Sequence, residues 1–160
     1  MNIVRHAEEI ARAAHAKQKY YIGRNAYPFF DSHVEPVAAI VRAMGYGEKT
    51  VAGALLHDVV EDSPWTIDGL REEGIPEETV EAVDAVTERK GETPIQFLDR
   101  SIKVARAIVI RFADSSTQFS GTIQQTGFME LNRYRKRIQK HGRVVAITHP
   151  ILPDPRTLKD

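Results

Sequence analysis

Cysteine is absent from the sequence, which excludes disulfide bonds and thiolate metal ligands. A strong metal site would therefore have to use histidine and carboxylate side chains. An excess of charge of one sign is also absent, because 22 basic residues balance 22 acidic residues. Nothing in the overall charge favours nucleic acid or an acidic membrane as a partner, so any preference for phosphate groups must be local.

Long hydrophobic runs are missing as well. No segment approaches the roughly 18 apolar residues that a membrane-spanning helix needs, and the first residues lack the apolar centre of a secretory signal. We therefore expect a cytoplasmic protein that has no membrane-spanning segment. A length of 160 residues with 42% apolar residues fits one globular domain with a single core.

Strand-like alternation is rare, and most apolar residues recur at the three- and four-residue spacing of helices. The sequence therefore predicts an all-α fold. We expect the folded domain to comprise residues 1–145. Residues 146–160 contain three of the eight prolines, which favours an extended tail.

Two loops are predicted between the helices. Residues 17–32 interrupt the helical pattern and are rich in aromatics, so they form either a platform for a nucleobase or a plug over the core. Residues 121–127 are expected to form a loop before a last helix that begins at Met129. In the first predicted helix, we expect His6 and His15 to be surface or capping residues.

Residues 55–62 place four ionisable side chains at the end of an apolar segment: His57, Asp58, Glu61 and Asp62. A helix over residues 50–60 would stack each of the first two above one of the last two, four residues later. Carboxylates gathered at a helix C-terminus repel one another and the helix dipole, whereas a bound divalent cation would reverse the sign of that interaction. The alternative is a helix end with solvated acids.

Two more residues favour the metal interpretation over that alternative. His33 opens a predicted helix, where a histidine is poorly placed to fill the core. Asp114 ends the apolar run of residues 104–112, and an unpaired carboxylate buried there would cost several kcal/mol or take up a proton. We predict that a metal ion is the partner of Asp114.

These residues carry a resemblance to the HD-domain metal-dependent phosphohydrolases. The chain is most similar to the branch that contains the (p)ppGpp hydrolase domains of the RelA/SpoT type and their small stand-alone relatives. The matching stretches are residues 14–18, 33–38, 54–62 and 110–114. The resemblance implies a single-domain HD-type helical bundle.

The resemblance also implies a metal site made of His33, His57, Asp58 and Asp114. Two imidazoles and two carboxylates leave coordination positions for water, which suits Mn²⁺, Fe²⁺ or Mg²⁺ better than a closed zinc site. The family implies Mn²⁺, with another divalent ion as the alternative. In the similar hydrolases, the acids that match Glu61 and Asp62 position the attacking water and shuttle its proton.

Two departures from the family pattern concern the substrate. Where the family usually has a basic run, this chain has Lys19 followed by Tyr20 and Tyr21, and Gln118 stands where the family has an asparagine. We expect Lys19 to bind a phosphate remote from the reaction, Tyr20 to stack on the base, and Gln118 to contact the substrate. Hydrolysis of (p)ppGpp should then be weaker than with a fully basic loop.

The leading hypothesis is a metal-dependent phosphohydrolase that acts on a phosphorylated nucleotide, like the (p)ppGpp pyrophosphohydrolases. The rival is a nucleotide- or nucleic-acid-binding module that uses the predicted basic helix at residues 133–143, which has six Lys or Arg and no acid. Because the net charge is zero, we interpret that helix as a solvated face and expect no nucleic-acid partner. The leaving group, phosphate or pyrophosphate, is left open, as is assembly into a homo-oligomer.

Overall fold

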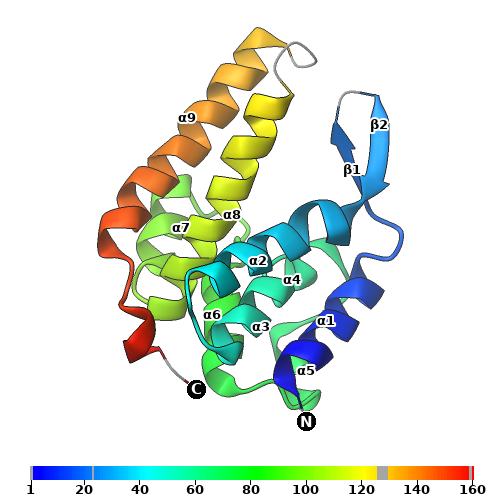
Figure 1. Cartoon of the computed structure of the whole chain (residues 1–160), viewed down its shortest axis with the longest axis vertical. Coiled ribbons are helices and arrows are strands. Elements are labelled where there is room, and N and C mark those ends of the chain that lie inside the picture. The colour runs from blue at the N-terminus through cyan, green and yellow to red at the C-terminus, as the bar shows by residue number, and fades with distance from the viewer. Residues whose placement is uncertain (1, 23, 126–129, 159) are drawn as a thin grey trace.

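The computed structural model describes residues 2–22, 24–125, 130–158 and 160, and it is predominantly helical (Figure 1). The predicted all-α, single-domain class is confirmed. In chain order the elements are α1 (Ile3–Ala14), β1 (Lys19–Ile22), β2 (Asn25–Pro28), the π-helical turn η1 (Phe30–Val34), α2 (Glu35–Ala43), α3 (Glu48–Leu56), α4 (Val59–Asp62), α5 (Ile67–Glu72), α6 (Glu77–Val86), α7 (Pro94–Ser101), α8 (Ala105–Gln124), α9 (Leu131–Thr148) and the 3₁₀ turns η2 (His149–Ile151) and η3 (Pro155–Thr157).

Helix α3 is the centre of the core. Every residue from Thr50 to Leu56 is buried, and the helix packs against α1, α2, α6 and α8. At Gly53, an added Cβ would lie 2.9 Å from the terminal methyl of Ile110 of α8, so a larger residue there would require the Ile110 side chain to shift. The core therefore fixes the end of α3, where the ionisable stretch begins.

The predicted continuous helix over residues 50–60 is wrong at its end. Helix α3 stops at Leu56, His57 and Asp58 form a turn, and α4 begins at Val59. The backbone of Asp58 has φ −100° and ψ −5°, and the His57 Nδ1 donates a hydrogen bond to the carbonyl of Ala54 at 2.7 Å. In this turn the side chains of His57 and Asp58 face one centre, with Nε2 and Oδ2 3.1 Å apart.

Helices α8 and α9 pack side by side as a long pair that rises above the other helices (Figure 1). The loop expected at residues 121–127 is wrong for its first part, because α8 continues through Gln124. Its helical hydrogen bonds extend past Gly121, whose lack of a side chain leaves room for the hydroxyl of Tyr20. Residues 126–129, which include the expected helix start at Met129, lie outside the described residues.

The loop expected at residues 17–32 contains the antiparallel hairpin β1–β2, in which Tyr20 pairs with Tyr27, and then the turn η1. The hairpin rises beside the upper part of α8 (Figure 1), and the side chain of Gln125 donates a hydrogen bond to the carbonyl of Tyr21 at 3.2 Å. Within the described residues this is the only sheet. The aromatic segment is therefore an ordered wall next to α8.

The segment expected as an extended tail at residues 146–160 is helical up to Thr148 and then folds back over the core. Leu152 and Leu158 pack against the core, and the hydroxyl of Tyr46 donates to the carbonyl of Pro153 at 2.6 Å. Burial of these two leucines explains why the segment does not extend into solvent. Among the described helices, none combines the length and the hydropathy that a bilayer crossing requires.

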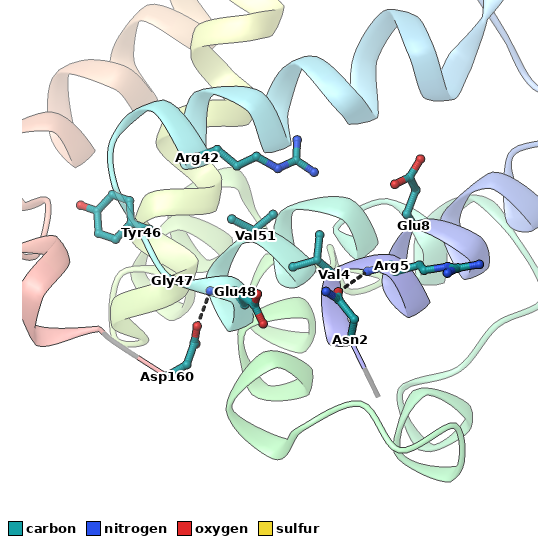
Figure 2. A pocket seen from close by; sticks show the side chains of 10 residues that line it. All are labelled: Asn2, Val4, Arg5, Glu8, Arg42, Tyr46, Gly47, Glu48, Val51 and Asp160. Atoms are coloured by element: carbon teal, nitrogen blue, oxygen red, sulfur yellow. Dashed lines mark hydrogen bonds between the residues drawn. The ribbon is translucent and has the colours of Figure 1, made fainter.

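Asp160 lies against the first turn of α3, beside a pocket that also contains residues of α1 (Figure 2). Its carboxylate accepts hydrogen bonds from the backbone N–H groups of Glu48 and Lys49. A Cβ on Gly47 would come within 2.6 Å of that carboxylate. The C-terminal segment thus caps the helix whose other end carries His57.

Candidate active site

The four predicted metal ligands come together although they are far apart in the sequence. His33 comes from η1, His57 and Asp58 from the turn after α3, and Asp114 from α8. The Nε2 atoms of His33 and His57 are 3.2 Å apart, and Asp58 Oδ2 lies 3.2 Å and 3.1 Å from them, respectively. Asp114 Oδ1 lies 3.4 Å from the Nε2 of His33. The side chains of the two histidines are only 1% and 4% exposed.

The hydrogen bond from His57 to the chain determines which of its nitrogens is free. Since the carbonyl of Ala54 can only accept, the Nδ1 of His57 must donate, and the neutral ring then has a lone pair on Nε2. That lone pair faces the Nε2 of His33 and the carboxylate of Asp58. Such a group of acceptors requires a cation, either a proton or a metal ion.

The electrostatics of the cluster agree with this requirement. Burial lowers the pKa of His57, but the charge and hydrogen bond of Asp58, together with the charge of Asp114, raise it to about 9. Burial would raise the pKa of the Asp58 carboxyl, but the two histidines hold it far below its usual range. The donor atoms of His33, His57 and Asp58 all lie within 4.8 Å of one another. The cluster therefore has the donors, the spacing and the charge to hold a divalent ion.

Glu61 and Asp62, predicted as a catalytic pair, point to different places. Glu61 lines the cavity beside the cluster, and its carboxylate accepts a hydrogen bond from the backbone N–H of Glu88. Burial raises the pKa of Glu61. Asp62 is not among the described residues that line this cavity, and its Oδ2 accepts a hydrogen bond from the Gln18 side chain at 2.9 Å.

His15 was expected at the surface or as a capping residue: it is the C-cap of α1, but it is buried instead of lying at the surface. Only 2% of its surface is exposed, and its ring lies 5.0 Å from the ring of Phe29. Its Nδ1 lies 2.7 Å from Oε1 of Gln18, whose amide nitrogen donates to Asp62. Because an amide oxygen can only accept, His15 must donate. The separation of His15 and Gln18 by three residues was the sequence signal for this contact.

The three predicted substrate-binding residues lie in different surroundings. Gln118 lines the cavity one turn after Asp114, and its Oε1 accepts a hydrogen bond from Arg137 of α9 at 2.8 Å. The ring of Tyr20 is parallel to that of His33 within 4°, at a centroid distance of 6.1 Å. Lys19 is exposed at the start of β1. Gln118 and Tyr20 are thus near the cluster, whereas Lys19 is exposed at the base of the hairpin, where it pairs with Pro28.

The cavity beside the cluster has a volume of about 130 Å³. One part of its wall carries basic side chains that were not predicted as site residues. Arg111 of α8 lines it, as do Lys140 and His141 of α9. Arg111 precedes Asp114 by three residues and therefore shares its helix face, which is a signal that the sequence contained. For Lys140 and His141 no such signal existed, because only the packing of α9 against α8 places them here.

The chain was compared with known proteins. No family model matches it. In an alignment of 123 positions that covers 71% of the chain, the sequence is 33% identical to a Mycobacterium leprae protein described as a probable GTP pyrophosphokinase, and the match spans 15% of that protein's length.

The fold is similar to a solved structure of a metazoan ortholog of SpoT, which is described as hydrolysing ppGpp and playing a role in starvation responses. The TM-score is 0.80 at 21% identity, and the match covers 98% of this chain and 91% of the other. These findings confirm the resemblance to a small (p)ppGpp hydrolase-like domain.

Proposed function

We propose that the chain is a divalent-metal-dependent phosphohydrolase that acts on a phosphorylated nucleotide, with (p)ppGpp as the reference substrate. The observation that carries the proposal is the convergence of two imidazole Nε2 atoms, 3.2 Å apart, with two carboxylates beside a cavity that has cations on its other side. Such an arrangement suits a phosphate ester, whose charge needs stabilisation on both sides. The likeness in fold to a protein described as hydrolysing ppGpp supports the proposed phosphohydrolase function.

In this proposal, His33, His57, Asp58 and Asp114 hold the ion, and Mn²⁺ is the ion that we expect. The ion would polarise a phosphoryl oxygen and favour the ionisation of water at neutral pH. The chain's part is to fix the donor atoms, which it does through the buried turn after α3 and the hydrogen bond from His57 to Ala54. That bond orients the ring and keeps its Nε2 available.

The two acids have separate tasks. Glu61, on the cavity wall with a raised pKa, accepts the proton of the attacking water and returns it to the leaving oxygen. The oxygen of water bonds to phosphorus, and the bond from phosphorus to the leaving oxygen breaks. Asp62, held by Gln18, supports the end of α4 from which Glu61 projects.

The nucleoside has a place of its own next to the cluster. A second cavity of about 340 Å³ lies between the hairpin, α2 and α8, and none of the described residues that line it is charged. Tyr20 belongs to its wall and also stacks on His33. Hydroxyl groups from Ser116, Thr117 and Ser120 offer hydrogen bonds to a base or ribose. A nucleotide lying along α8 would thus place its phosphates toward the cluster.

The rival function is a binding module that uses the basic helix. Part of the basic surface of that helix is already engaged within the protein. Arg137 donates to Gln118 and to the hydroxyl of Thr122 at 3.2 Å, so its guanidinium is engaged with α8. Lys140 lines the cavity of the candidate site. These cations serve the interior of the α8–α9 pair and the site, which is more consistent with a small anionic substrate than with a nucleic-acid face.

The test is a panel of purine nucleotides with one to four phosphates, incubated with metal-free protein and with Mn²⁺. Both phosphate and pyrophosphate are measured, with His57→Ala as the matched inactive variant. We expect Mn²⁺-dependent release of one product from a nucleotide with more than one phosphate. Equal release by the wild type and by His57→Ala would contradict the proposal, as would the absence of turnover across the panel in a folded, metal-loaded protein.

A further inference from the structure

The two histidines of the cluster are oriented in different ways. His57 donates from Nδ1 to the carbonyl of Ala54 at 2.7 Å, which is the usual way in which a metal-binding histidine is held. His33 has no such bond, because its Nδ1 is fully buried and makes no hydrogen bond to any residue that the structure describes. Only 1% of the His33 side chain is exposed and its Nε2 faces the cluster, so another kind of contact has to fix the angle of its ring.

Within the described part of the chain, three rings pack against His33. The ring of Tyr20 from β1 is parallel to it within 4°, at a centroid distance of 6.1 Å. The ring of Phe29 lies 5.1 Å away at an angle of 50°, and that of His57 meets it in an edge-to-face arrangement at 5.2 Å. Because rings prefer stacked and edge-to-face arrangements, these contacts limit the rotation of the imidazole, as a hydrogen bond would.

Helix α8 sets the place of the Tyr20 ring. An added Cβ at Gly121 would come within 2.8 Å of the Tyr20 hydroxyl oxygen, whereas the ring carbon Cζ would lie 3.9 Å from it. Glycine leaves room for that hydroxyl at a position inside α8 where alanine is the better helix former. Phe29 in turn contacts the ring of His15 at the end of α1, with 5.0 Å between the centroids. The two rings are thus placed by α8 and by the end of α1, respectively.

We propose that Tyr20 is a positioning residue that acts through His33. Its ring, together with that of Phe29, holds the imidazole at the angle that directs Nε2 toward the metal ion, in place of the hydrogen bond that His33 lacks. The inference rests on the proposed function, since the metal site is part of it. It gives Tyr20 a task different from the expected stacking on a base, and it makes metal affinity depend on an aromatic ring of the hairpin.

The test measures two quantities for the full chain. The first is the Mn²⁺ dissociation constant, by competition with a chromophoric chelator. The second is the set of His33 imidazole signals in the NMR spectrum of the metal-free protein. Tyr20→Phe keeps the ring and Tyr20→Leu removes it. Tyr21→Leu is the matched control, because Tyr21 is 61% exposed on the same strand. Thermal melts show whether each variant is folded.

Gly121→Ala disturbs the same ring from the side of α8, and it is made alone and together with Tyr20→Phe. The added methyl group should displace the Tyr20 hydroxyl and weaken Mn²⁺ binding. Tyr20→Phe should restore the affinity in the double variant, because the atom that collides is gone and the next one lies 3.9 Å away. This pair of variants decides the matter even if Tyr20→Leu does not fold.

We expect Tyr20→Phe and Tyr21→Leu to bind Mn²⁺ as the wild type does. Tyr20→Leu should weaken Mn²⁺ binding by about tenfold or more, the usual effect of losing an outer partner of a metal ligand. Its His33 signals should broaden or double, because the ring then takes more than one angle.

Wild-type Mn²⁺ affinity in Tyr20→Leu would overturn the inference, as would an equal loss in Tyr21→Leu or a loss in Gly121→Ala that Tyr20→Phe does not relieve. A lower melting temperature with unchanged affinity and unchanged His33 signals would show that Tyr20 only fills space. The proposed function is tested separately. A wild type that binds no divalent ion would overturn the metal site, whereas the His33 signals of the metal-free protein would still report whether Tyr20 holds the ring.

Discussion

The two sides of the candidate site are built on different parts of the molecule. The cluster side rests on two segments of the core: His33 lies buried on η1, and His57 and Asp58 form the turn at the end of the core helix α3. The substrate side is formed by the hairpin β1–β2 and by α9, where Lys19 and Lys140 are exposed. Substitutions on the cluster side should therefore change stability and reaction together, whereas those of exposed residues on the substrate side should change binding alone.

The largest effect is expected on the cluster side. Asp58→Ala removes a carboxylate that faces both imidazoles, so we expect loss of stoichiometric metal and a fall in turnover of about 10³-fold or more. Metal stabilises the native state by about 2.7 kcal/mol at 100 times its dissociation constant. A chelator should therefore lower the melting temperature of the wild type but not that of Asp58→Ala. Asp99→Asn, an exposed acid on α7, is the control; full metal content in Asp58→Ala would remove Asp58 from the ligand set.

Glu61→Gln should separate reaction from metal binding. Because Glu61 lines the cavity but is not part of the His-His-Asp cluster, the variant should keep its metal and slow turnover by about 10²–10⁴-fold. The measurements are kcat under saturating substrate and metal content by mass spectrometry. A wild-type kcat would exclude Glu61 as the proton carrier.

Asp62 should behave as a positioning residue that acts through its hydrogen bond to Gln18. Asp62→Asn and Gln18→Leu should each lower kcat by about tenfold, less than the loss of Glu61 itself, because they act only through the position of α4. Gln18→Leu removes the hydrogen bond to Asp62 and also the one from His15, so the double variant should be no worse than Gln18→Leu alone. Multiplicative losses in that cycle would show that the two residues act independently.

On the substrate side, Lys19→Ala should raise KM by about two- to fivefold with little change in kcat, as expected for an exposed ionic contact that contributes uniform binding. Tyr21→Ala is the matched control, because Tyr21 is 61% exposed on the same strand. Initial rates over a range of substrate concentrations give both constants. If kcat fell and KM did not change, Lys19 would have to act in the reaction step.

The smallest effect is expected far from the cluster. Asp160→Ala removes the carboxylate that caps α3 at Glu48 and Lys49, which should lower the free energy of unfolding by about 0.5–2 kcal/mol. Because the cap lies at the other end of α3 from His57, turnover should not change. Urea denaturation and an activity assay measure the two quantities, and a loss of activity without a loss of stability would link the two ends of α3.

Much of the cluster could be predicted from sequence. The adjacent pair His57 and Asp58 after an apolar segment is a local pattern, and Asp114 closes an apolar run in the same way. The helical periodicity was sufficient for the all-α class, since burial of one face of each helix is itself a local requirement. His33 was found because a histidine at a predicted helix start disagreed with a core role, although the structure places it inside η1, where its side chain is buried.

What the sequence by itself determined is the set of chemical groups and the helices that carry them. The tertiary structure alone decided that Asp62 turns to Gln18, that the guanidinium of Arg111 packs on the Phe97 ring, and that Lys140 reaches the cavity. Each of these facts depends on contacts between segments that are dozens of residues apart. Periodicity tells which face of a helix is buried, but the packing of α8 and α9 on the core sets which side chains meet, and that packing has no local signal.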